Sequence, residues 1–112
     1  MIGYKIVKIT DTADEYKTLF HAIEGSKTMR SGRWLKASVK RVRDGSGGTY
    51  YDSGIHVLPS LSEALRYMEN FKDVFDKTIV RVECKNSRVK GHSRSSVLLC
   101  DEIKIIDEVW VI

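Results

Sequence analysis

The chain has 112 residues and a net charge of +4, with 42% hydrophobic and 30% charged residues, a composition typical of globular proteins. This length predicts a single domain over residues 1–112 that can bury a core without disulfides or metals. The composition excludes a collagen, a coiled coil and a disordered chain, and no apolar run approaches the ~20 residues of a membrane-spanning helix.

The N-terminal segment lacks the apolar core and cleavage site of a signal peptide, so we expect a cytoplasmic protein with no membrane partner. Cys84 and Cys100 lie in apolar runs and are expected to be reduced core residues. A disulfide between them would require neighbouring strands to align the two thiols. Since the histidines and cysteines lack metal-ligand spacing, we expect no metal and no other cofactor.

Strand patterns dominate the first half of the chain. Apolar residues predict strands over 2–9 and 16–22, and a short return strand over 28–30. From Arg33 to Arg43 the residues alternate, which predicts one half-buried strand with Trp34, Lys36 and Lys40 on its outer face. The glycine-rich segment 44–49 lacks the phosphate-loop pattern and is interpreted as a hairpin connection.

The stretch from Tyr51 to Phe71 contains the strongest helix signal. An extended run over 54–58 is followed by Ser60 and, three residues later, Glu63, the pattern of a helix N-cap. Apolar residues then recur at three- and four-residue steps. Strands over 78–85, 97–100 and 103–112 follow, the last one bent or divided. We therefore predict an α+β domain, with a mostly antiparallel β-sheet packed around one principal helix at about 60–72.

Positive charge is concentrated in two segments without acids. Residues 26–43 hold seven basic residues and residues 85–94 hold four, so these segments carry +11 and the rest of the chain carries −7. Clustered cations favour an anionic partner because binding releases counterions, although nearby acids in the fold could balance them. Trp34 beside lysines suits base stacking combined with phosphate contacts. The candidate anion-binding residues are Arg33, Trp34, Lys36, Lys40, Arg41, Arg43, Arg88, Lys90 and Arg94.

Three short motifs resemble those of ADP-ribosyltransferase-like folds. They are Leu19–Ala22 with its histidine, Gly54–Val57 before a helix, and Cys100–Ile103 with its glutamate. The resemblance implies an NAD-dependent enzyme or a degenerate, inactive relative, in which His21 contacts the NAD ribose and Glu102 polarises the ribose or the acceptor. His56 stands where that family has a stacking tyrosine, so the chain departs from the pattern at the nicotinamide position.

The order of three longer segments is similar to that in small uncharacterised proteins of phages and mobile elements. These segments are Trp34–Ala37, Tyr51–Val57 and Lys90–Ile103. The resemblance implies no activity, but it suits an accessory protein that binds nucleic acid or a host nucleic-acid-processing complex, including as an inhibitor of a defence nuclease. A protein–protein inhibitor and a dimer formed through exposed strand edges remain open alternatives.

Overall fold

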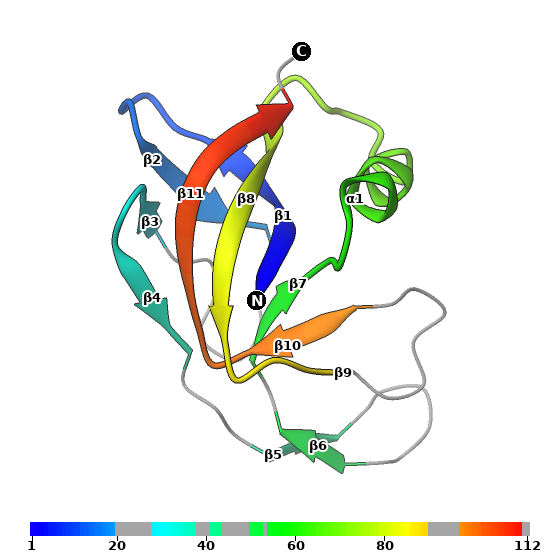
Figure 1. The fold of residues 1–112 in the computed structure, drawn as a ribbon. Coiled ribbons are helices and arrows are strands. Elements are labelled where there is room, and N and C mark those ends of the chain that lie inside the picture. Colours follow the sequence, from blue (N-terminus) through cyan, green and yellow to red (C-terminus); the bar gives the residue numbers. More distant parts are fainter. Residues whose placement is uncertain (20–27, 38–40, 44–49, 53, 90–96, 111–112) are drawn as a thin grey trace.

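The computed structural model describes residues 1–19, 28–37, 41–43, 50–52, 54–89 and 97–110 (Figure 1). Within these ranges the fold is a mostly antiparallel β-structure with one short helix, α1. The elements are β1 (Ile2–Ile9), β2 (Glu15–Thr18), β3 (Thr28–Arg30), β4 (Trp34–Lys36), β5 (Arg41–Arg43), β6 (Tyr50–Asp52), β7 (Ile55–Val57), α1 (Leu61–Met68), β8 (Lys77–Lys85), β9 (Arg88–Val89), β10 (Leu98–Cys100) and β11 (Glu102–Trp110).

The largest sheet has six strands in the order β3-β2-β1-β8-β11-β4, and every pairing in it is antiparallel. Its central strands are long. In β1 and β8 the apolar residues are buried at alternate positions, and on both faces where a layer covers each side of the sheet. β11 curves strongly along β8 (Figure 1), and their register shifts between Ile105 and Asp107 and again between Glu108 and Trp110. These irregularities bend one strand, as expected where extra residues interrupt a ladder.

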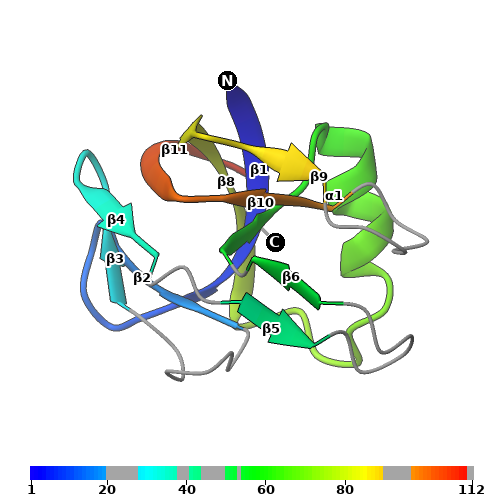
Figure 2. The ribbon, with the colours of Figure 1, turned by 90° about the horizontal axis from the view of Figure 1, so that it is seen from below.

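A second sheet has the strand order β7-β10-β9. Its strands β9 and β10 lie in one long hairpin with β8 and β11. β8 continues into β9 and β10 continues into β11, and the hairpin turns a corner between them (Figure 2). At this corner Asn86 has a positive φ of 53°, and the Asp101 N–H donates to the Lys85 carbonyl at 3.0 Å. The corner therefore brings the second sheet over one face of the first.

Two apolar clusters hold these layers together. The larger cluster is built from strand residues, including Val82 and Ile103 of the six-stranded sheet and Val57 and Cys100 of the second sheet, and contains no helical residue. The smaller one joins Ala64 and Met68 of α1 to the opposite face of the sheet. The strands thus pack mainly on one another, and α1 covers one end of the sheet (Figure 1).

Helix α1 begins as the sequence predicts. The Ser60 Oγ accepts a hydrogen bond from the Glu63 N–H at 3.2 Å, which satisfies one of the free donors of the first turn. The helix ends at Met68, several residues before the predicted end near 72, because residues 69 and 70 form a turn. Phe71 still packs against the helix cluster, so the apolar spacing continued after the helical hydrogen bonds had stopped.

One strand prediction was wrong. The described parts of the segment from Arg33 to Arg43 do not belong to one strand of one sheet, because β4 pairs with β11 in the six-stranded sheet while β5 pairs with β6 in a separate two-stranded sheet. Alternation reports which face a residue occupies and does not identify the partner strand. Among the described residues, no helix has the length and apolar character that crossing a bilayer requires.

Candidate nucleic-acid interface

Strand β4 forms one edge of the six-stranded sheet and carries Trp34 and Lys36 on the same side. Both residues are exposed, whereas Leu35 between them and Ala37 after them pack against the larger core cluster. The sequence predicted this orientation from the alternation of the residues. Trp34 is 36% exposed, which leaves part of its surface available to a partner.

Two lysines from neighbouring strands lie over the indole. The Lys85 Nζ is 3.9 Å from the centroid of the Trp34 ring, and the Lys104 Nζ is 5.1 Å from it. Lys104 lies directly across from Trp34 in the β11–β4 register. Ammonium groups are attracted to the electron-rich face of an indole, which explains the arrangement. Lys85 belongs to the second basic segment of the sequence and Trp34 to the first, so the two segments meet here.

Two acids border this cluster. The Glu102 carboxylate is 4.0 Å from the Lys85 Nζ, and the Glu83 carboxylate is 3.8 Å from the Lys104 Nζ. We call these residues, together with Lys36, the Trp34 face: Trp34, Lys36, Glu83, Lys85, Glu102 and Lys104. Both ion pairs are long and partly solvent-exposed, and such pairs contribute little to stability. The carboxylates therefore hold the lysines only weakly.

The basic segments approach each other a second time around Asp101. Arg88 donates from Nη1 to the Asp101 carboxylate at 2.7 Å, and this hydrogen bond is the main reason that the pKa of Asp101 lies below its usual value. The charge of Lys36 lowers the pKa further. Arg88 is therefore committed to an internal ion pair at the corner of the hairpin. Among the described residues, Lys36 near this corner and Arg33, which precedes the other end of β4, are exposed and form no ion pair.

The other predicted anion-binding residues lie elsewhere or outside the described ranges. Arg41 and Arg43 are in β5, which belongs to the separate two-stranded sheet. Lys40, Lys90 and Arg94 lie outside the described residues. Sequence reasoning did not select Lys104, although its position two residues after Glu102 in an alternating run places it on the face that carries Trp34.

The two described residues of the enzyme alternative, Glu102 and His56, lie in different surroundings. Glu102 lies on the Trp34 face beside Lys85, whereas His56, in β7, lines a hollow with Lys5 and Tyr67 that does not include Glu102. His21 lies outside the described residues. Within the described ranges, no three side chains of histidine, cysteine, aspartate or glutamate gather as a metal site would require.

Neither a protein-family model, a curated protein nor a solved structure matches this chain. The residues of the Trp34 face and their geometry therefore carry the functional argument.

Proposed function

We propose that this chain is a small nucleic-acid-binding module that holds a single-stranded or otherwise unpaired segment on its Trp34 face. The observation that carries the proposal is the approach of the Lys85 Nζ to within 3.9 Å of the Trp34 ring, which joins the two basic segments around an exposed aromatic surface. Aromatic rings stack on bases of any sequence, and flexible lysines bind phosphates, so the two kinds of side chain together suit nucleic acid.

The local charges are compatible with phosphate binding. Among the described residues, Lys36 has no carboxylate partner, and Lys85 and Lys104 have only long, partly exposed ion pairs. A phosphate can replace these carboxylates because it accepts charge-assisted hydrogen bonds from the same ammonium groups. A base that stacks on Trp34 would displace Lys85 from the ring, and the flexible stem of Lys85 allows the ammonium to move to a neighbouring phosphate.

The test measures binding of a fluorescently labelled single-stranded oligonucleotide by fluorescence anisotropy at a series of salt concentrations. We expect the double variant Lys36→Ala/Lys85→Ala to bind more weakly and to reduce the salt slope by about 1.4, because each lost phosphate contact removes about 0.7 from the slope for single strands. The matched control is Lys17→Ala/Lys72→Ala, which removes the same charge from two exposed lysines on β2 and after α1.

Equal losses in the two double variants would mean that net charge alone drives binding and would overturn the assignment to the Trp34 face. An acidic protein partner is the competing outcome, and it would be retained in a pull-down after nuclease treatment. The accessory role in a phage or mobile element, including inhibition of a defence nuclease, stays a hypothesis based on sequence resemblance.

The ADP-ribosyltransferase-like alternative also stays a hypothesis, since it depends on the same kind of resemblance. It requires NAD consumption that disappears in Glu102→Ala. We give it second place because Glu102 and His56 lie in different surroundings.

A further inference from the structure

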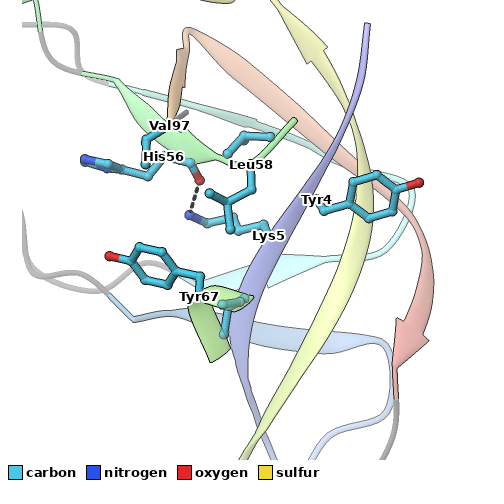
Figure 3. Close-up of a pocket in the computed structure, with 8 residues that line it drawn as sticks. Tyr4, Lys5, His56, Leu58, Tyr67 and Val97 are labelled. Carbon is cyan, nitrogen blue, oxygen red and sulfur yellow. Dashed lines mark hydrogen bonds between the residues drawn. The ribbon is translucent and has the colours of Figure 1, made fainter. Parts of the chain in front are cut away.

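A small hollow lies where β1, β7 and α1 meet, and it shares no residue with the Trp34 face (Figure 3). The free space within it and at its mouth, open solvent included, totals ≈ 330 Å³. Its lining residues are Tyr4, Lys5, Ile6, His56, Val57, Leu58, Tyr67 and Val97. Most of this surface is apolar, and among the described lining residues Lys5 carries the ammonium group. We propose that the hollow binds a small molecule that joins an apolar body to one carboxylate, with Lys5 as the partner of the carboxylate.

Lys5 is unusually buried for a lysine. The residue is only 4% exposed, in the middle of a strand, and lysine is rarely buried to this extent without a paired charge. Its Nζ donates one hydrogen bond, to the His56 carbonyl at 2.7 Å. An ammonium has three donors, so two are left without a partner among the described residues. No carboxylate of the described residues pairs with it.

The groups that face the ammonium do not supply the missing charge. They come from the described elements packed around it: the His56 carbonyl from β7, the Cys84 thiol from β8, the Cys100 thiol from β10 and the Tyr67 side chain from α1. Thiols are weak acceptors compared with a carboxylate. Burial accordingly lowers the pKa of Lys5 from 10.5 to about 8. An anion beside the ammonium would reverse this penalty, so the site gains from a ligand that brings one.

The walls define the rest of the ligand. Ile6, Val57, Leu58 and Val97 present hydrocarbon, and the ring of Tyr67 lies on the same side of the hollow as His56 (Figure 3). A phosphate or sulfate group would need several strong donors, such as arginines, and the described lining residues include none. A singly charged carboxylate on an aliphatic or aromatic body matches one ammonium surrounded by apolar side chains.

The test uses hexanoate as the probe and hexan-1-ol as its neutral analogue, with the full chain. Calorimetry should detect hexanoate binding to the wild type, with at least tenfold weaker binding of hexanol. We expect hexanoate affinity to fall at least tenfold in Lys5→Met, which keeps an apolar side chain of similar length. The matched control is Lys8→Met, an exposed lysine on the same strand, which should bind hexanoate as the wild type does.

Two further readouts do not depend on any variant. Hexanoate affinity should fall as the pH rises from 7 to 9, because the ammonium that binds the carboxylate loses its proton around pH 8. Methyl resonances of Val57, Leu58 and Val97 should shift on addition of hexanoate to the wild type. The proposal is overturned if these methyl groups do not respond, if hexanol binds as tightly as hexanoate, or if Lys5→Met retains wild-type affinity. Failure of oligonucleotide binding would leave it untouched, since the two sites share no residue.

Discussion

Two lysines in this molecule carry the same charge in opposite surroundings. Lys5 is 4% exposed and donates a single hydrogen bond to a carbonyl, whereas Lys85 lies on the sheet surface above an exposed indole and beside a carboxylate. Surrounding protein penalises the first charge, because apolar groups replace water. Water and the indole stabilise the second. Equal formal charges therefore have very different consequences for folding and for binding.

The comparison separates two kinds of functional signal. A surface cation is common and costs little, so Lys85 points to a partner only together with Trp34 and the neighbouring lysines. A buried ammonium without a carboxylate partner lowers the stability of the folded protein, so Lys5 indicates a function even without neighbouring charged or aromatic residues. Stability measurements should therefore respond to Lys5, and binding of nucleic acid should respond to the Trp34 face.

The largest expected effect is on stability, in Lys5→Met. The lowering of the Lys5 pKa from 10.5 to about 8 corresponds to about 3 kcal/mol of lost stability, so the variant should be more stable than the wild type by up to about 3 kcal/mol at neutral pH. Urea unfolding at pH 7 measures this difference. Lys8→Met, on the same strand, should change stability by less than about 0.5 kcal/mol.

The pH dependence of that difference sharpens the comparison. Below pH 8 the folded and unfolded chains both hold the proton on Lys5, so the full penalty applies. Between about pH 8 and 10.5 the unfolded chain binds more protons, and the stability of the wild type therefore rises relative to the variant. The advantage of Lys5→Met should disappear as the pH approaches 10.5. An advantage that stays constant with pH would mean that packing, and not charge, is responsible.

A smaller effect is expected on binding, in Trp34→Ala. Loss of one stacking platform costs about 1–3 kcal/mol per base, so oligonucleotide affinity should fall about tenfold. Trp34→Phe keeps a smaller ring and should lie between the wild type and Trp34→Ala. Because Trp34 lies on an edge strand and is 36% exposed, both variants should remain folded, which urea unfolding can check. Equal affinities of all three proteins would remove Trp34 from the interface.

Much of the local structure could be predicted from the sequence. The strand over Ile2–Ile9, the Ser60 cap and the outward orientation of Trp34 all follow from residue patterns whose cause is local. Sheet membership could not be predicted, because the partners of β4 and β5 are set by contacts far away in the chain. The end of α1 was missed for a similar reason: Phe71 contributes to the same apolar cluster without being helical.

For the candidate sites too, the sequence predicts features set by neighbouring residues and misses those set by contacts distant in the chain. Charge clustering indicated two basic segments, but only the antiparallel register places Lys104 opposite Trp34. Lys5 gave no signal, since a lysine between Tyr4 and Ile6 normally marks the exposed face of a strand. It is buried because the second sheet covers that face of β1, where Val57 lies so close to Gly3 that a side chain on Gly3 would collide with it. No local sequence pattern indicates that the second sheet covers this face of β1.

The smallest expected effects compare an ion pair of intermediate burial with a more exposed one. Arg88 and Asp101 pair through one hydrogen bond of 2.7 Å, with side chains 31% and 32% exposed. Arg81 and Asp107 pair through two hydrogen bonds of 3.0 and 2.8 Å, with side chains 41% and 46% exposed. If burial governs the value of a charge here, Asp101→Asn should cost about 1 kcal/mol and Asp107→Asn about 0.5 kcal/mol.

The pH dependence tests whether the effect of Asp101→Asn comes from the charge of Asp101, and the relative losses of the two variants separate burial from geometry. The pKa of Asp101 is lowered, mainly by its hydrogen bond from Arg88, so its stabilising effect is present above the ordinary pKa of 3.8 and is lost as the pH falls through the lower value in the folded protein. Asp101→Asn should therefore differ from the wild type at pH 7 and converge with it in strong acid. A larger loss in Asp107→Asn would show that paired hydrogen-bond geometry outweighs burial on this sheet, and the contrast between Lys5 and Lys85 would then apply only to fully buried charges.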